Sequence, residues 1–151
     1  RAGLRGEVGD AAIAEWGAER VGLHIAPRGD SHDMGDSNPL ATFGYVAEEM
    51  RKRRIAFIFA RESQAPGRIG PELKRLFGGV FIANQELDLA TAQALLDKGE
   101  ADAAAWGKLY IANPDLARRL RDGAPLNPPD ADSFYQGDAK GYTDYPALET
   151  A

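Results

Sequence analysis

The chain has 151 residues, about the size of one ordinary domain, and its content of 44% hydrophobic and 27% charged residues is typical of a globular protein. Its formal net charge of -5 provides no basic surface for nucleic acid, and the absence of cysteine excludes disulfides and thiolate metal sites. No apolar run approaches 18 residues and no leader pattern precedes the first helix, so we expect a cytoplasmic protein that does not enter a membrane. Because the chain begins with Arg1 and not with Met, we expect a processed, cleaved or partial chain.

Short apolar runs alternate with helical patterns along the first 123 residues. The apolar spacing predicts a helix from about residue 4 to residue 16, ended by Gly17. Ser37 or Asn38 is expected to cap a second helix, Asp88 a later one, and Asn113 the last, with Pro114 as its first residue. The predicted strands are 21–26, 55–60, 80–83 and 103–106, and the predicted helices after them are 39–54, 70–77, 88–98 and about 114–122.

This regular alternation predicts βαβ units and a parallel sheet covered by helices. The spacing between strand starts is close to that of one unit of an eight-fold (β/α) barrel, which needs roughly 250 residues in all. Four units therefore predict half of a TIM barrel. A doubly wound open sheet fits the same alternation, but the glycine fingerprint that usually follows an early strand of that fold is missing.

The last 28 residues differ in composition from the rest, with four prolines and four aromatic residues. So many aromatic side chains are unusual for a free linker, and we expect an ordered strap packed on the body. The expected division is 1–123 for the half-barrel and 124–151 for the strap.

Candidate functional residues follow the predicted strands, because ligands of such barrels bind at the carboxyl ends of the strands. Gly107 allows close approach to a backbone, Lys108 supplies a positive charge, and a following helix start supplies N–H groups, a combination suited to a phosphate. The other strand ends carry His24, Arg28, Arg61, Glu62 and Asn84.

Each of these residues also has a purely structural interpretation. Gly107-Lys108 can be a plain turn, His24 a packed inner-layer residue, and Arg61-Glu62 a salt-bridged start of a loop. His32 lies in a polar loop with three aspartates, which can indicate a metal site, although the spacing matches no known loop motif and a solvated loop is favoured. No serine–histidine–acid pattern is found.

Several motifs, in this order and spacing, resemble the carboxyl-terminal half of the Old Yellow Enzyme family. They are WGAERVG at 16–22, MGDSNPLATF at 34–43, GKLYIANPDL at 107–116, APLN at 124–127, SFY at 133–135 and GYTDYP at 141–146. The family consists of FMN-containing (β/α)8 barrels that take hydride from NAD(P)H and reduce activated C=C bonds, with some members acting on nitro compounds or nitrate esters. The resemblance therefore implies strands five to eight of such a barrel, with FMN as cofactor and NAD(P)H as hydride donor.

The resemblance also implies roles for individual residues. Ala83, Asn84, Gly107 and Lys108 are expected to hold the FMN phosphate, with Lys108 in the place of the arginine common in the family. His24 stands in the place of an arginine that lies against the flavin ring in relatives. Tyr135 is expected to line the substrate side of the flavin and to shape the pocket there.

The resemblance places the catalytic His/Asn pair and the proton-donating tyrosine in an amino-terminal half, so no catalytic residue is expected in this chain. We therefore expect that half as a partner, together with a small-molecule enone substrate. A flavin- or phosphate-binding half-barrel without turnover is the alternative, and a phosphate-binding isomerase barrel is disfavoured by the motifs of the strap.

Overall fold

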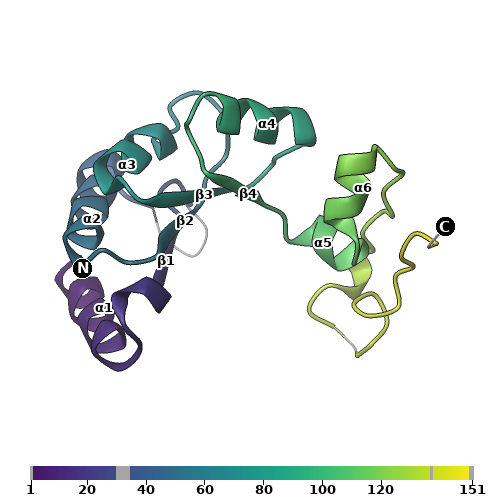
Figure 1. Ribbon diagram of the computed structural model, residues 1–151, viewed down its shortest axis with the longest axis horizontal. Coiled ribbons are helices and arrows are strands. Elements are labelled where there is room, and N and C mark those ends of the chain that lie inside the picture. Colours follow the sequence, from purple (N-terminus) through teal and green to yellow (C-terminus); the bar gives the residue numbers. More distant parts are fainter. Residues whose placement is uncertain (1, 30–34, 137, 150–151) are drawn as a thin grey trace. The chain divides into compact units, whose positions relative to one another are not determined.

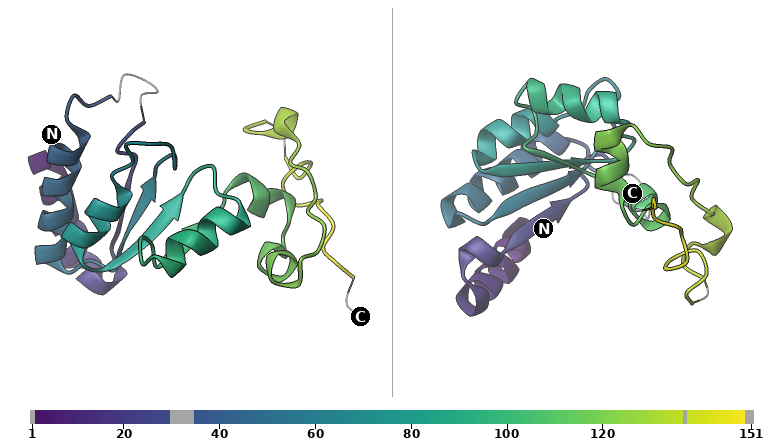
Figure 2. Two further views of the ribbon diagram at one scale, coloured as in Figure 1. Left: turned by 90° about the horizontal axis from the view of Figure 1, so that it is seen from above. Right: turned by 45° about the vertical axis from the view of Figure 1, so that its right-hand side comes forward.

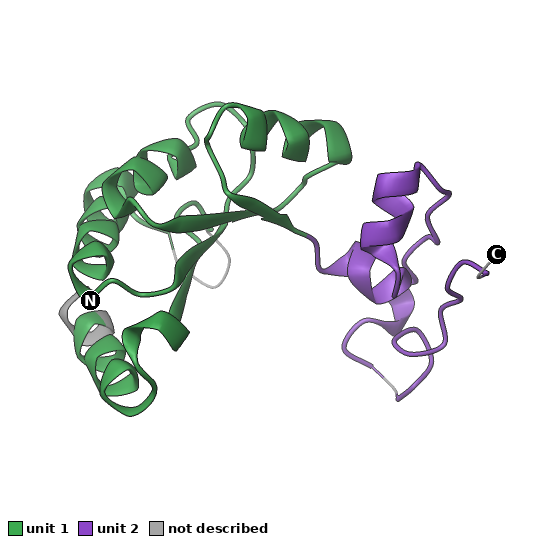
Figure 3. Cartoon of the chain, viewed as in Figure 1, with its two compact units in different colours: residues 1–105 green, residues 106–151 purple. Residues whose placement is uncertain are grey.

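The computed structural model describes residues 2–29, 35–136 and 138–149, with side chains from residue 6 onward. The chain forms two compact units, residues 1–105 and residues 106–151 (Figure 3). Each unit is described by itself. The division predicted after residue 123 stays a prediction, and the strap predicted for residues 124–151 lies within the second unit.

The first unit is built on a parallel sheet whose strands follow one another in chain order. The sheet contains β1 (Gly22–Ile25), β2 (Phe57–Arg61), β3 (Val80–Asn84) and β4 (Ala103–Ala105). Helices α2 (Pro39–Arg53), α3 (Gly70–Phe77) and α4 (Leu89–Asp97) connect the strands, and α1 (Ala2–Trp16) with the short 3-10 helix η1 (Ala18–Arg20) precedes them. The strand–helix alternation expected from the sequence is confirmed.

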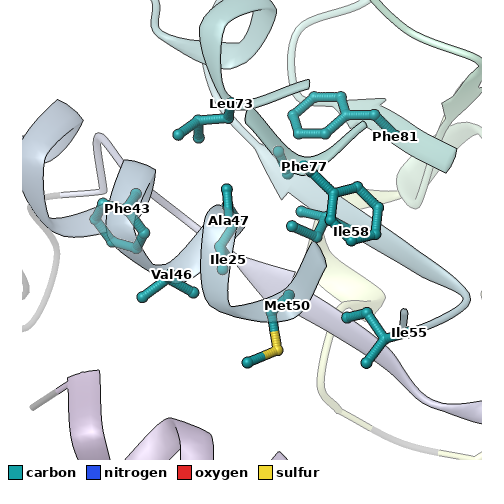
Figure 4. Close-up of a cluster of buried hydrophobic side chains, with 11 residues drawn as sticks. Ile25, Phe43, Val46, Ala47, Met50, Ile55, Ile58, Leu73, Phe77 and Phe81 are labelled. Carbon is teal, nitrogen blue, oxygen red and sulfur yellow. The ribbon is translucent and has the colours of Figure 1, made fainter. Parts of the chain in front are cut away.

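The hydrophobic core lies between the sheet and the helices on one of its faces (Figures 1 and 2). Alternate residues of the strands, such as Ile58 and Phe81, are buried against Leu73 and Phe77 of α3 and the apolar face of α2 (Figure 4). Because successive side chains of a strand point to opposite faces, the residues between them share the other face. That second face positions the candidate site.

Local signals set most ends of these helices. The Asn38 side chain accepts a hydrogen bond from Ala41 N at 3.2 Å and Pro39 is the first residue of α2, so the predicted cap is Asn38 and not Ser37. Asp88 accepts from Thr91 N at 2.7 Å and caps α4, as predicted. Gly78 ends α3 with a left-handed backbone at φ 69°.

The second unit contains two short helices where the sequence predicts one. Helix α5 (Lys108–Ala112) begins directly after Gly107, and α6 (Leu116–Asp122) follows, with the 3-10 helix η3 (Ala131–Ser133) further along. The prediction that Asn113 caps the last helix is wrong, because Asp115 occupies that position and the Asn113 side chain is fully buried in other contacts. Asn113 Nδ2 donates to Leu109 O and Asn127 O, and its Oδ1 accepts from Asn127 N at 2.7 Å.

The strap is bound to α5 and α6 through buried polar side chains. The Arg119 guanidinium donates to Pro125 O, to Pro146 O at 2.8 Å and to the Asp115 carboxylate at 2.6 Å. Asp115 in turn accepts from Leu148 N at 2.8 Å. Because buried polar groups without partners are costly, this network fixes both arms of the strap on the helices.

None of the helices in the described ranges is both long and apolar enough to cross a bilayer.

Candidate functional site

The face of the sheet opposite the core carries an ordered set of side chains. The pairing register places His24, Phe59, Ile82 and Ala103 in one row across the four strands. The next row, at the carboxyl ends of the strands, contains Arg61, Asn84 and Ala105. The sheet therefore brings the predicted residues His24 and Asn84 onto one face, in adjacent rows.

His24 is an exposed side chain within an otherwise apolar row. Its ring meets Phe59 edge to face, with the centroids 4.7 Å apart and an interplanar angle of 76°. Toward the residues that the structure describes, the imidazole nitrogens make no hydrogen bond. They remain available to a ligand lying on this face, and an imidazole can serve there as a donor, an acceptor or, when protonated, a cation.

The turn after β3 has an unusual backbone. Asn84 Nδ2 donates to Ala105 O at 2.7 Å, which ties the ends of β3 and β4 together, while Ala83 is buried toward the core. The next two residues, Gln85 and Glu86, both have left-handed backbones, at φ 91° and 55°. Such conformations cost energy for residues other than glycine and cluster at ligand sites.

The loops after β2 and β3 are also joined to each other. Ser63 Oγ donates to Glu86 Oε2 at 2.8 Å, and Glu62 N donates to Asn84 O at 3.1 Å. The sequence pattern did not indicate Gln85 or Glu86, because neither residue type signals a left-handed turn. These contacts hold the carboxyl-end loop of β3 in one shape.

Glu62 has a structural role. Its buried carboxylate accepts hydrogen bonds from Ile69 N at 2.8 Å and Gly70 N at 2.7 Å, at the start of α3. The interpretation of Arg61-Glu62 as a salt-bridged start of the loop is wrong, because the Glu62 carboxylate accepts from backbone N–H groups and forms no ion pair among the described residues. Arg61 is exposed and forms no ion pair within the described part of the chain.

The predicted Gly107-Lys108 turn begins the second unit and leads directly into α5. Apart from the two neighbouring residues in the chain, no described residue has an atom within 4 Å of the point where a Cβ on Gly107 would stand, so the backbone there is open to a ligand. The Lys108 ammonium lies 5.8 Å from the centroid of the Phe134 ring. This distance is within the range of a cation–π contact, so the second unit itself supplies a partner for the Lys108 charge.

Within the second unit, these features suit a phosphate group. Gly107 offers open space, the first turn of α5 has backbone N–H groups without partners inside the helix, and Lys108 supplies a positive charge. Such a site would bind an anion through a single positive charge. A lysine ammonium cannot donate two parallel hydrogen bonds to one phosphate as an arginine guanidinium can. In the first unit, Asn84 and the two residues with left-handed backbones after it form an ordered loop at the carboxyl end of β3.

Tyr135 is the most exposed aromatic side chain of the second unit, with 99% of its surface accessible. Its backbone is left-handed, at φ 59°, and its N–H donates to the Tyr142 hydroxyl at 2.7 Å. The predicted roles of Tyr135 and of the other five site residues stay predictions. Lys108, Phe134 and Tyr135 belong to the second unit, whereas His24 and Asn84 belong to the first.

The metal interpretation of the polar loop finds no support in the described residues. His32, Asp30 and Asp33 lie outside them, and the Asp36 carboxylate accepts a hydrogen bond from Asn38 N at 2.8 Å. No group of three or more histidine, aspartate or glutamate side chains that could hold a metal ion occurs in 6–29, 35–136 and 138–149.

The comparison with curated proteins matches almost the entire chain. The 12-oxophytodienoate reductase 1 of Oryza sativa subsp. japonica is 39% identical over 155 residues, covering 95% of this chain and 40% of that protein. A Leishmania infantum protein named "Probable flavin mononucleotide-dependent alkene reductase" is 37% identical over 145 residues. The match covers 94% of this chain and 40% of that protein. No family model matches the chain.

Solved structures give the same result. The Old Yellow Enzyme homologue from Zymomonas mobilis superposes with a TM-score of 0.92 at 35% identity, over 97% of this chain and 44% of that one. The Old Yellow Enzyme from Trypanosoma cruzi gives 0.91 at 32% identity, over 98% and 40%. Morphinone reductase in complex with tetrahydroNAD gives 0.89 at 40% identity, over 95% and 40%.

The sheet, its helices and these superpositions define the chain as part of a (β/α) barrel, as the strand spacing predicts. Within that class, the resemblance to the Old Yellow Enzyme family predicted from the motifs is confirmed. The chain spans about 40% of the length of the curated relatives it matches.

Proposed function

We propose that this chain is the flavin-phosphate part of an FMN-dependent ene-reductase that works together with a companion barrel half. The observation that carries the proposal is the similarity of nearly the entire chain to a 12-oxophytodienoate reductase and to a protein named as a probable flavin mononucleotide-dependent alkene reductase. The chemistry that bound FMN supplies is the passage of hydride from NAD(P)H to an activated C=C bond, in enones and possible further substrates such as nitro compounds or nitrate esters. The cytoplasmic location stays a prediction of the sequence.

The residues of this chain would bind and orient the cofactor. Gly107 and the first N–H groups of α5 would receive phosphate oxygens, with Lys108 as the cation. The turn at Ala83 and Asn84 would present a second set of donors, held in place by the Asn84 hydrogen bond to Ala105. His24, standing free on the open face, would contact the flavin ring, and Tyr135 would form part of the substrate wall.

The bare face of the sheet supports the requirement for a companion half. Within the described residues of the first unit, β1 and β4 each have one unpaired edge, and α2 and α3 pack on the face opposite the one that bears His24. Parallel sheets are normally covered on both faces, and open edges invite association. The companion half would supply the missing strands and the groups that anchor and protonate the alkene.

The test is an anaerobic titration of the FMN-loaded protein, chain and companion half together, with NADPH. We expect the flavin absorbance to bleach and to return when 2-cyclohexenone is added. A flavin that binds but stays oxidised would overturn the ene-reductase proposal.

A second candidate is a flavin- or phosphate-binding half-barrel without turnover. Two residues favour it, because each is expected to bind FMN less strongly than an arginine would. Lys108 also contacts the Phe134 ring, and position 24 carries a histidine. This candidate predicts FMN binding with no bleaching by NADPH, so the same titration separates the two.

A further inference from the structure

The part of the strap that bears Tyr135 is a closed loop with a fixed neck. Asn127 Nδ2 donates to Pro146 O at 2.9 Å, joining the two points where the loop leaves and rejoins the helices. Both points are also anchored on the helices, Asn127 by Asn113 and Pro146 by Arg119. The loop is therefore a surface element whose two ends are held close together.

Two tyrosines brace the loop from its returning arm. The Tyr142 hydroxyl accepts from Tyr135 N at 2.7 Å, and the Tyr145 hydroxyl accepts from Asp130 N at 2.8 Å. Both N–H donors lie on the outgoing arm. The two bonds are chemically alike, but only the one from Tyr142 reaches the residue predicted to face substrate.

Close contact between the arms fixes the place of Tyr142. Gly141 has a left-handed backbone at φ 76°, and a Cβ on it would overlap the Ser133 side chain. Gly141 N donates to Asp144 Oδ1 at 2.7 Å, which closes the turn on the other side of Tyr142. The Tyr142 ring therefore starts from a defined backbone position.

Tyr135 depends on this support for its direction. Its side chain is almost entirely exposed, so no packing within the described residues holds the ring, and the backbone sets the direction in which the side chain leaves the loop. A left-handed backbone at a residue other than glycine persists only where the surroundings enforce it. Two hydrogen bonds act directly on that backbone: Gln136 N donates to Ser133 O at 3.3 Å across the turn that contains Tyr135, and Tyr135 N donates to the Tyr142 hydroxyl. Of the two, the bond to Tyr142 comes from the returning arm.

We propose that Tyr142 is a positioning residue: its hydroxyl holds the left-handed backbone of Tyr135 and so aims the Tyr135 ring at the substrate. The proposal rests on the proposed function, in which Tyr135 lines the substrate side of the flavin. Tyr142 itself touches neither substrate nor cofactor in this account.

The first test needs no substrate and measures amide hydrogen exchange in the full chain. Tyr142→Phe removes only the hydroxyl, so we expect faster exchange at the Tyr135 amide. Tyr145→Phe removes the matched hydroxyl and is expected to speed exchange at Asp130 while leaving the Tyr135 amide protected. Equal exchange at Tyr135 in the parent and in Tyr142→Phe would overturn the proposal.

The second test follows enone reduction by the FMN-loaded protein with its companion half. In Tyr142→Phe we expect the KM for 2-cyclohexenone to rise about fivefold, as for the loss of one neutral hydrogen bond, with kcat within about twofold. Tyr145→Phe should leave KM near that of the parent. If both variants raise KM equally, the loop needs general support only, and a positioning role for Tyr142 is excluded.

A double-mutant cycle with Tyr135→Ala decides whether Tyr142 acts through Tyr135. Once the Tyr135 ring is absent, Tyr142→Phe is expected to have no further effect on KM, so the two effects are non-additive. Additive effects would contradict the proposal. If NADPH does not bleach the flavin of the parent protein, the ene-reductase function is wrong. If NADPH bleaches it normally but the KM of Tyr142→Phe equals that of the parent, only the positioning role of Tyr142 is wrong.

Discussion

His24 is the residue at which this chain differs most in chemistry from what its resemblance predicts. The exposed imidazole lies in an apolar row, edge-on to Phe59, and is shorter than an arginine. It has one N–H donor when neutral and two when protonated, whereas a guanidinium has five. A permanent guanidinium at this point would give a flavin a stronger and more constant partner.

We predict that His24→Arg strengthens FMN binding. A charge-assisted hydrogen bond in place of a neutral one is worth about 1 kcal/mol, or roughly fivefold in Kd. Quenching of FMN fluorescence in the complete protein measures the change, and His24→Gln, which offers a neutral amide, is the control. An Arg variant that binds no better than the Gln variant would show that position 24 does not face the flavin.

Residues with unusual backbones were the hardest to foresee from the sequence. Gln85, Glu86 and Tyr135 all have positive φ, yet none is a glycine or asparagine that would signal it. Glu62 was ambiguous for another reason, because its partners Ile69 and Gly70 come together with it only after α3 has packed. Contacts of this kind arise from tertiary structure and leave no local pattern.

Helix ends in the first unit were readable because their signals are local. The Asn38 cap bonds Ala41, three residues away, and the Asp88 cap bonds Thr91 at the same spacing. Asn113 carries an equally good local signal and fails, because Asn127, which lies in the strap, takes its side chain. Competition from a distant partner decided the outcome.

We predict that Asn38→Ala lowers the free energy of unfolding by about 1 kcal/mol, since it leaves an N–H at the start of α2 without its cap. Ser37→Ala is the matched control and should change stability by less than about 0.5 kcal/mol, as exposed substitutions usually do. Urea unfolding followed by circular dichroism gives both values. Equal losses in the two variants would mean that the cap is shared.

The strap should loosen in acid through Asp115. The N–H of Leu148 and then the Arg119 guanidinium hold the pKa of the Asp115 carboxyl below its ordinary value. The stabilisation is therefore present above the pKa of the unfolded chain and is lost as pH falls through the lower pKa of the folded one. We expect exchange at the Leu148 amide to rise over that acidic window.

Substitution separates this effect from general acid unfolding. Asp115→Asn should loosen the strap at neutral pH and remove the acid dependence at Leu148. Glu72→Gln removes a carboxylate that is paired with Arg75 within α3 of the first unit, and it should leave the Leu148 profile unchanged. An unchanged profile in Asp115→Asn would exclude Asp115 as the titrating group.

At the scale of the molecule, the open face of the first unit predicts association. Phe59, Ile82 and Val80 lie on the face away from the core, and Val80 is almost half exposed. We expect the isolated chain to form larger species in light scattering and to form a one-to-one complex when the companion half is added. A stable, monodisperse monomer would argue against a companion on this face.

A charge on the open face should block that complex. We predict that Ile82→Lys abolishes binding of the companion half, because a buried lysine without a partner is costly. Leu89→Lys, on the exposed side of α4, adds the same charge away from the face and should bind normally. Native mass spectrometry distinguishes the two results.

The order of the strands also bears on how the first unit acquires its structure. Every strand pairs with its neighbour in sequence, Gly22 with Phe57 and Ile82 with Ala103, so each pairing closes a loop of only a few tens of residues. Short closures lower the entropic barrier, and folding of such units can advance strand by strand as they leave the ribosome. In a complete barrel, the pairing between the first and the last strand can form only after the entire chain has been made. All strand pairings within this unit join neighbours in sequence, so none of them has to wait in this way.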